Sequence, residues 1–216
     1  MSQKGLFVVV DSTDGSGKSS MIKTLHTNFI QRNLDVWLTE ESTRGPFGLS
    51  VRELIRSHSP LDPWTLAMLF ATDRIHHRLA VHEALAKGRL VLCDRYIYSG
   101  IAFSTYNICV RDHQCSRNHV RQALSTLHEQ LPLPTPDLAI VMSVPAPLAI
   151  KRIKERGRKE FLKEFETETA IEKVHEEFHA LGQSGLYPKM RIVDNSESFE
   201  KTTAAVLSIS DRLFNS

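Results

Sequence analysis

The stretch LFVVVDSTDGSGKSS, residues 6–20, joins an apolar run to a glycine-rich segment that ends in a basic residue. It nearly matches the phosphate-loop pattern G-x-x-x-x-G-K-[ST], whose last three positions are Gly17, Lys18 and Ser19. Ser12 stands where the first glycine of the pattern belongs. Such a loop is convincing only between a buried strand and a helix, and apolar spacing on both sides predicts these two elements. The stretch therefore predicts a phosphate site with one local substitution.

The loop residues have separate expected tasks. Backbone N–H groups at the start of the helix point at phosphate oxygens, Lys18 reaches the outer phosphates, and the Ser19 hydroxyl is expected to ligate Mg²⁺. A glycine-rich turn that binds no ligand is the alternative interpretation. The expected ATP-phosphate-binding residues are Asp14, Gly15, Ser16, Gly17, Lys18, Ser19 and Ser20.

Composition limits the class of protein. The 216 residues are 41% hydrophobic and 24% charged, as in ordinary soluble globular proteins. A net charge of +2 argues against a nucleic acid polymer as partner, and no apolar run is long enough to span a membrane. The first residues lack the apolar core of a signal peptide. Three cysteines cannot all pair, so we expect reduced thiols and a cytoplasmic location.

Strand-like and helix-like segments alternate along the chain. Five short apolar runs predict strands at 5–11, 35–40, 89–94, 137–144 and 190–194. Longer segments predict helices at about 18–33, 48–58, 62–87, 117–130, 146–156, 167–182 and 198–214. This alternation predicts an α/β fold, a doubly wound five-stranded parallel sheet with helices on both faces. No linker or repeat divides the chain, so residues 1–216 are expected to form a single domain.

The third predicted strand ends in Asp94 and Arg95, at the sheet edge where doubly wound folds bind ligands. Asp94 is a candidate to hold Mg²⁺, directly or through water. Arg95 is a candidate to bridge phosphoryl oxygens with its forked guanidinium. A strand-end ion pair without a ligand is the alternative for either residue alone.

Three further segments carry a family resemblance: LFATDR (69–74), DRYIYSGIAFS (94–104) and TEESTRGPFG (39–48). Together with the phosphate loop, they resemble the thymidylate kinase family of P-loop nucleoside monophosphate kinases, from about Leu6 to Leu213. The resemblance implies a P-loop kinase fold with a short helical lid at about 151–168.

The resemblance also implies a binding site for dTMP. Phe70 would stack on thymine, Arg74 would bond the base, and Phe103 would pack under the deoxyribose. The Asp14 carboxylate would bind the 3′-hydroxyl, and Arg44 is the candidate for the acceptor phosphate. The full implied set is Asp14, Arg44, Phe70, Arg74, Arg95, Ser99, Gly100 and Phe103.

The resemblance places further cations in the lid. Family members without an arginine in the phosphate loop, where this chain has Gly15, usually supply that cation from the lid. Arg156 is expected on the adenine side, and Arg158, Lys159 or Lys163 would complete the charge around the phosphoryl group. The catalytic set implied in this way is Lys18, Arg95, Arg158 and Lys163.

The resemblance predicts phosphoryl transfer from ATP to dTMP, which gives dTDP and ADP, in a homodimer. Catalysis would rest mainly on positioning and charge neutralisation. No general base is obviously required, because the acceptor phosphate is already anionic. Three alternatives stay open: a kinase for another nucleoside monophosphate or a deoxynucleoside, a nucleotide-dependent regulatory module, and a catalytically impaired homologue. The absence of an Asn-Lys-x-Asp motif counts against a GTPase.

Two groups of histidines invite other interpretations. Cys109, His113, Cys115 and His119 have a spacing that departs from structural zinc sites, so a surface loop and helix start is the preferred interpretation. His76, His77 and His82 are expected to lie on the surface of one helix.

Overall fold

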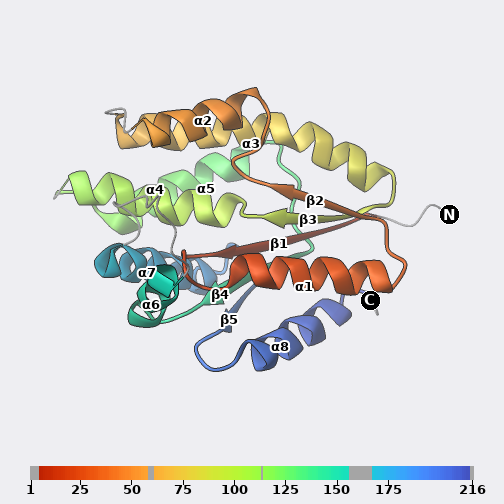
Figure 1. The fold of residues 1–216 in the computed structure, drawn as a ribbon. Helices are drawn as coiled ribbons and strands as arrows, with labels where there is room; N and C mark the ends of the chain where they lie inside the picture. Colours follow the sequence, from red (N-terminus) through yellow and green to blue (C-terminus); the bar gives the residue numbers. More distant parts are fainter. Residues whose placement is uncertain (1–4, 58–60, 113, 156–166, 215–216) are drawn as a thin grey trace.

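The computed structural model describes residues 5–57, 61–112, 114–155 and 167–214 (Figure 1). Its centre is a five-stranded sheet in the order β2-β3-β1-β4-β5, and every neighbouring pair is parallel. The strands are β1 (Leu6–Ser12), β2 (Val36–Glu40), β3 (Leu90–Asp94), β4 (Leu138–Ser143) and β5 (Met190–Asp194). All five expected strands are present, and the parallel sheet is confirmed.

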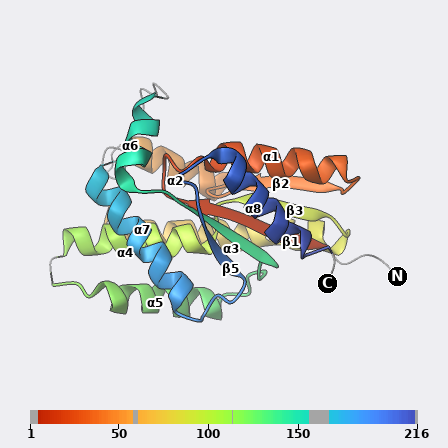
Figure 2. The same cartoon turned by 90° about the horizontal axis from the view of Figure 1, so that it is seen from below.

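The helices of the described residues lie on both sides of this sheet. They are α1 (Lys18–Gln31), α2 (Pro46–Arg56), α3 (Pro63–Ala86), α4 (Ile97–Arg111), α5 (Arg117–Gln130), α6 (Ala146–Glu155), α7 (Glu168–Gln183) and α8 (Phe199–Asp211). Helices α1 and α8 lie over one face of the sheet, and α3, α4, α5 and α7 lie over the other (Figure 2). Their buried side chains form two separate cores with the strands. This is the doubly wound arrangement that the sequence predicts.

The central strand shows why the apolar runs are continuous. Phe7 and Val9 of β1 belong to the core on the α3–α4–α7 side, whereas Val8 and Val10 belong to the core on the α1–α8 side. All four side chains are fully buried. A strand covered on both faces needs apolar residues at every position, so no alternation with polar residues appears.

Helix starts carry ordinary capping residues. Asp62 accepts a hydrogen bond from the Thr65 N–H at 2.8 Å, and Pro63 occupies the first turn of α3. Ser116 and Thr167 cap α5 and α7 in the same manner. These side chains satisfy backbone donors that have no partner inside the helix, and they fix where each helix begins.

Helix α4 was not among the predicted helices, which pass from 62–87 directly to 117–130. The structure instead continues as a helix from Ile97 to Arg111. Most of its side chains are buried on more than one side, including Tyr98, Ile101 and Ala102. A helix that is enclosed by its neighbours has no polar face, so the amphipathic period that reveals other helices is missing.

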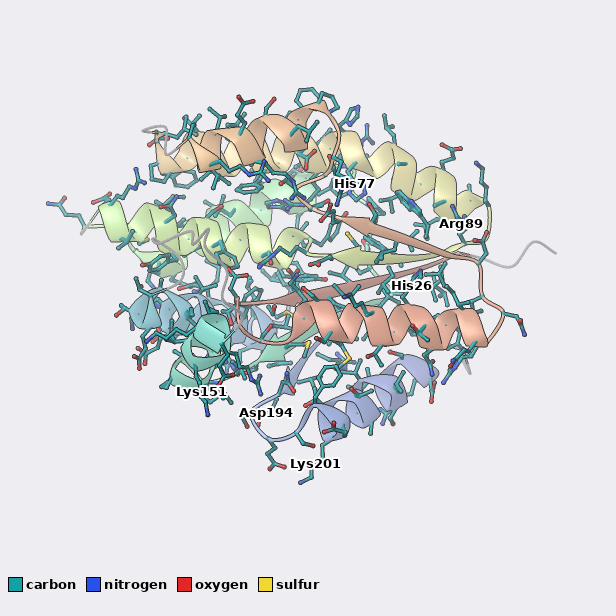
Figure 3. All side chains as sticks on the ribbon, viewed as in Figure 1. His26, His77, Arg89, Lys151, Asp194 and Lys201 are labelled. Carbon is teal, nitrogen blue, oxygen red and sulfur yellow. A yellow bond between two sulfur atoms is a disulfide. The ribbon has the colours of Figure 1, made fainter. Side chains whose placement is uncertain are left out.

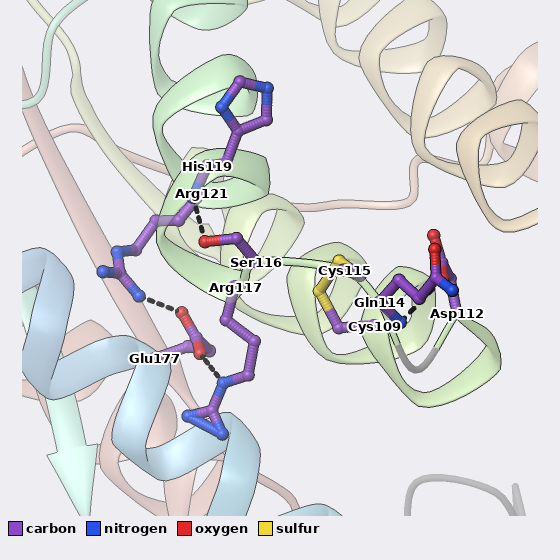
Figure 4. Close-up of a disulfide and its surroundings, with 9 residues drawn as sticks. All are labelled: Cys109, Asp112, Gln114, Cys115, Ser116, Arg117, His119, Arg121 and Glu177. Atoms are coloured by element: carbon purple, nitrogen blue, oxygen red, sulfur yellow. Dashed lines mark hydrogen bonds and ion pairs between the residues drawn. A yellow bond between two sulfur atoms is a disulfide. The ribbon is translucent and has the colours of Figure 1, made fainter.

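Two of the three cysteines are paired, which corrects the expectation of reduced thiols. Cys109, in the last turn of α4, forms a disulfide with Cys115, just before α5, and Cys93 is a free buried thiol (Figure 4). Figure 4 also shows the His119 ring directed away from the two sulfurs. The paired sulfurs are not thiolate ligands, and His113, the third group of the zinc alternative, lies outside the described residues.

Candidate functional site

The phosphate loop spans the turn between the end of β1 and the start of α1. Gly15 and Gly17 have φ angles of +76° and +90°, which L side chains rarely adopt. A Cβ atom on Gly15 would lie 2.4 Å from the Ala149 carbonyl oxygen, and one on Gly17 would lie 2.8 Å from Asn195 Nδ2. Both glycines are therefore required by backbone conformation and by close packing, Gly15 against α6 and Gly17 against the residue that follows β5.

Ser12 has a different place from the one that the loop pattern suggests. It is the last residue of β1, paired in register with Met142, and it does not have a positive φ. Its carbonyl oxygen accepts a hydrogen bond from Arg95 Nη1 at 3.0 Å. A fully buried serine is sterically acceptable here, because the position lies in a strand and does not require a positive φ.

Asn195 braces the loop, and the sequence reasoning missed it. It follows β5, is 2% exposed, and donates a hydrogen bond from Nδ2 to the Ser16 carbonyl oxygen at 2.6 Å. In turn, Arg152 of α6 donates to the Asn195 carbonyl oxygen at 3.0 Å. The phosphate-loop motif does not include Asn195, because 179 residues separate it from Ser16 in the sequence.

Lys18, in the first turn of α1, forms an ion pair with Asp94 at the end of β3. Burial and the nearby Arg95 cation lower the pKa of Lys18, although Asp94 opposes this effect. The predicted cation of the phosphate loop and the predicted metal-holding carboxylate are thus brought together. A bound nucleotide would compete for both partners of this pair.

Arg95 is held from several sides. Its guanidinium donates to the Asp14 carboxylate at 2.7 Å and to Ser99 Oγ at 3.2 Å, and it lies 5.1 Å from the Phe103 ring centroid. Burial alone would lower the pKa of Arg95, but Asp14, Asp94 and Asp11 outweigh it and raise the pKa. Its backbone has a φ of 71°, an uncommon conformation that directs the chain from β3 into α4.

Asp11 lies beneath this arginine and is fully buried. Its carboxylate accepts hydrogen bonds from the Ser99 hydroxyl and from the Tyr96 N–H, the latter at 3.2 Å. Burial raises the pKa of Asp11 to about 6, against the opposing effect of the Ser99 hydrogen bond. Asp11 therefore fixes the start of α4 against the end of β1.

Arg74 of α3 is almost fully enclosed, with 3% of its side chain exposed. Its guanidinium donates from Nε to Glu41 Oε2 and from Nη1 to His128 Nε2, both at 2.7 Å, and from Nη2 to the Tyr96 carbonyl oxygen at 3.3 Å. A Cβ atom on Gly100 would lie 3.0 Å from Nη2, so glycine leaves room for the guanidinium. Neither Glu41 nor His128 was predicted.

Phe70 lies one helical turn before Arg74 on the same helix, so the two share a face of α3. Its side chain is half-buried. The structure therefore keeps the sequence-predicted pair close to one another, with Gly100 of α4 opposite Arg74.

Arg44 and Arg52 differ in their exposure. Arg44 is 87% exposed and pairs with Glu40 at 2.9 Å. Arg52 of α2 is 31% exposed, lies 3.4 Å from Glu40 and donates a hydrogen bond to the Ser42 carbonyl oxygen. Sequence reasoning did not single out Arg52, because no motif includes it and α2 also carries Arg56.

His77 corrects the interpretation of surface histidines. It is buried between α3 and β2, with Nδ1 3.0 Å from Glu41 Oε1 and Nε2 2.8 Å from Thr39 Oγ1 (Figure 3). His76 and His82 are exposed, as predicted. The difference arises because the side of α3 that carries His77 packs against the edge strand β2, and helical spacing alone does not say which side that is.

The remaining predicted residues divide into two groups. Ser19 is exposed in the first turn of α1, and with Asp94 it offers a hydroxyl and a carboxylate. Oxygen donors fit Mg²⁺, which proteins commonly hold through one or two carboxylates and substrate phosphates. The lid candidates Arg156, Arg158, Lys159 and Lys163 lie outside the described residues.

Within the described part of the chain, no helix is both long and apolar enough to cross a membrane.

A parallel sheet in the order 2-3-1-4-5, with a glycine-rich phosphate loop after its central strand, defines a protein of the P-loop kinase fold. The sequence profile described as thymidylate kinase matches residues 10–206. The chain therefore belongs to the thymidylate kinase family.

Several curated relatives are similar along nearly the whole chain. A probable thymidylate kinase of Pyrococcus abyssi is 34% identical over 213 residues, which cover 95% of this chain and 96% of the relative. A probable thymidylate kinase of Pyrobaculum aerophilum is 31% identical over 208 residues, which cover 96% and 97% of the two chains.

Two solved structures share the fold. The thymidylate kinase of Candida albicans has a TM-score of 0.81 at 23% identity, with 100% of this chain and 95% of that chain covered. The thymidylate kinase of Ehrlichia chaffeensis has a TM-score of 0.71 at 19% identity, with 96% and 99% covered.

Proposed function

We propose that this protein transfers the γ-phosphoryl group of ATP to dTMP and releases dTDP and ADP. Family membership supports this reaction. The observation that carries it is the convergence of Lys18, Asp94, Arg95 and Asp14 at the carboxyl ends of β1 and β3. Phosphoryl transfer needs mainly alignment and charge neutralisation, and this group offers both.

In this proposal the phosphate loop, residues Asp14 to Ser20, holds the ATP phosphates through its N–H groups and Lys18. Arg95 bridges the donor and acceptor phosphoryl groups, since its guanidinium is charged and fixed by Asp14. Mg²⁺ would supply further neutralising charge, with Asp94 and Ser19 as its protein oxygens.

The acceptor would lie between α3 and α4. Arg74 bonds the thymine base, Phe70 stacks on it, and Phe103 packs under the sugar. Asp14 would share its carboxylate between Arg95 and the sugar 3′-hydroxyl. We add Arg52 beside Arg44 as a candidate for the acceptor phosphate, because Arg52 is the less exposed of the two and contacts the Ser42 carbonyl oxygen of the same loop.

The lid at about 151–168 would close over ATP and supply Arg156 to the adenine and a cation, Arg158 or Lys163, to the phosphoryl group. Closure would exclude water and so prevent hydrolysis of ATP. We propose that this lid and the rest of residues 1–216 form one kinase domain that acts in the cytoplasm as a homodimer.

An acceptor panel tests the proposed function. ADP formation from ATP would be measured with dTMP, dUMP, dCMP, UMP and thymidine under identical conditions. We expect dTMP to give the highest kcat/KM. Turnover of another acceptor in preference to dTMP, or of none while ATP still binds, would contradict the proposal.

A further inference from the structure

His128 contacts the arginine that the proposed function assigns to the acceptor base, yet no motif includes it. It lies in the last turn of α5, 54 residues after Arg74, and is 7% exposed. Its Nε2 atom is 2.7 Å from Arg74 Nη1. The contact therefore joins α5 to α3 within the buried interior.

The hydrogen bonds of His128 determine which nitrogen carries the proton. Its Nδ1 atom lies 2.7 Å from the Leu124 carbonyl oxygen, which can only accept, so Nδ1 is protonated. The partner of Nε2 is a guanidinium, which can only donate, so Nε2 offers its lone pair. Burial and the adjacent Arg74 cation lower the pKa of His128 to about 4, in agreement with a neutral imidazole.

Glu41 holds only one end of the Arg74 guanidinium. Its Oε2 atom accepts from Nε of Arg74 at 2.7 Å, near the stem of the side chain, whereas its Oε1 atom is 3.0 Å from His77 Nδ1. Because the guanidinium is rigid and planar, a contact at Nε orients the whole group but holds it only at the end next to the side-chain stem. The contacts of Nη1 with His128 and of Nη2 with the Tyr96 carbonyl oxygen anchor the outer end of the group.

A guanidinium has five N–H donors, and three of those of Arg74 are directed at these partners. One further N–H remains on each of Nη1 and Nη2. Such donors favour a base with a carbonyl oxygen, as thymine has at position 4, over cytosine, which carries a donating amino group there. The direction of these two N–H groups therefore affects how strongly the site prefers thymine over cytosine.

We infer that His128 is a positioning residue that fixes the terminal donors of Arg74 and thereby sets the preference for an acceptor base with a carbonyl at position 4. The inference rests on the proposed function, because that proposal assigns Arg74 to the base. His128 acts through Arg74 and does not itself contact the nucleotide.

Two substitutions at His128 test this role. His128→Leu removes the acceptor and keeps an apolar side chain, whereas His128→Gln keeps an acceptor oxygen near the position of Nε2. His119→Leu, on an exposed position of the same helix, is the matched control. For each variant, kcat and KM are measured for dTMP, dCMP and ATP, together with the thermal unfolding midpoint.

We expect His128→Leu to lower the ratio of kcat/KM for dTMP over dCMP by about tenfold, mainly through the KM of dTMP. The KM of ATP should stay at the wild-type value. His128→Gln should keep most of the ratio, and His119→Leu should keep all of it. A retained ratio in His128→Leu, or a parallel loss for dTMP, dCMP and ATP, would overturn the inference.

A measurement on the unaltered protein covers the case in which His128→Leu does not fold. The ¹⁵N resonance of His128 Nε2 should be that of an unprotonated nitrogen at pH 7 and should shift on addition of dTMP but not of ATP. A protonated Nε2 would overturn the inference. Wild-type protein that phosphorylates no acceptor would refute the proposed function itself, whereas an active wild type with an unaffected His128→Leu variant refutes only the role of His128.

Discussion

Ser12 and Asn195 together account for the unusual phosphate loop at the level of single residues. Ser12 ends β1 in extended backbone, so the position does not need the conformational freedom of glycine. The loop conformation is supported elsewhere, by the positive φ angles of Gly15 and Gly17 and by the hydrogen bond from Asn195 to the Ser16 carbonyl oxygen. Ser12 therefore stands out in the sequence without changing what the loop needs. Asn195, which no motif marks, supports the loop directly.

Replacement of Asn195 by alanine should weaken ATP binding. The variant loses the Nδ2 donor to the Ser16 carbonyl oxygen and leaves a buried acceptor without its partner, an effect of about 1–3 kcal/mol on the loop. We expect the KM of ATP to rise several-fold while the KM of dTMP stays within about twofold. Steady-state kinetics with each substrate varied in turn would measure this. Equal increases in both KM values would contradict the assignment of Asn195 to the ATP side.

His128 should also make stability depend on pH. Its folded-state pKa of about 4 lies below the ordinary value of 6.5, so between these values the unfolded chain binds a proton that the folded protein does not. The stabilisation is complete above pH 6.5 and is lost as the pH falls toward 4. Between pH 7 and pH 5, wild type should lose about 2 kcal/mol more unfolding free energy than His128→Gln.

Urea unfolding of both proteins at pH 7 and pH 5 gives this difference. Asp11 titrates in the same interval with the opposite sign, because its folded-state pKa of about 6 lies above the ordinary value of 3.8. Both proteins retain Asp11, so its effect cancels in the comparison. Identical pH dependence in the two proteins would show that His128 is not buried as a neutral imidazole.

At the level of elements, the sequence predicted those parts of the fold whose pattern is local. The five strands were readable because consecutive apolar residues mark strands buried on both faces, as in residues 7–10. Helix α4 could not be predicted in this way, because it is buried on more than one side and its sequence lacks the helical spacing of apolar and polar residues. The same distinction applies to the site.

The phosphate loop and the Asp94–Arg95 pair are contiguous motifs, so sequence alone could locate them. The contacts of Arg74 could not be located in this way, because Glu41, Arg74 and His128 come from the end of β2, from α3 and from α5. Only the packing of these elements brings one carboxylate and one neutral imidazole to the same guanidinium. Single-sequence patterns carry no information on such a contact.

The packing of α4 against α3 provides a test of its own through Gly100→Ala. The added Cβ atom would lie 3.0 Å from Nη2 and 3.1 Å from Nη1 of Arg74, so the guanidinium must shift by a few tenths of an ångström. We expect the KM of dTMP to rise several-fold and the KM of ATP to stay constant, with no loss of thermal stability because alanine favours the helix. A rise in the KM of ATP alone would place Gly100 outside the acceptor site.

At the level of the whole molecule, one side of the protein carries apolar side chains that its own core does not cover. Trp64, Met68 and Leu79 are exposed on one face of α3, and Phe47 and Leu49 are exposed at the start of α2. The spacing of the three α3 residues places them in a single stripe. This surface is our candidate for the interface of the proposed homodimer.

Met68→Glu combined with Leu79→Glu should convert the proposed dimer to a monomer, because two carboxylates would be buried without partners in the interface. Light scattering coupled to size-exclusion chromatography would give the molar mass of each form. Leu186→Glu, at an exposed apolar residue after α7, is the matched control. A wild-type protein that is monomeric at all concentrations, or a double variant that stays dimeric, would contradict this interface.

The most direct test of the proposed reaction is product analysis of wild-type protein and Lys18→Ala with ATP, dTMP and Mg²⁺. Lys18 is the largely buried cation of the phosphate loop that pairs with Asp94, so its removal should lower the rate by at least about a hundredfold. Anion-exchange chromatography should show wild type forming dTDP and ADP in equal amounts, and ADP should not accumulate without dTMP. ADP formation without dTDP, or an undiminished rate in Lys18→Ala, would contradict the proposal.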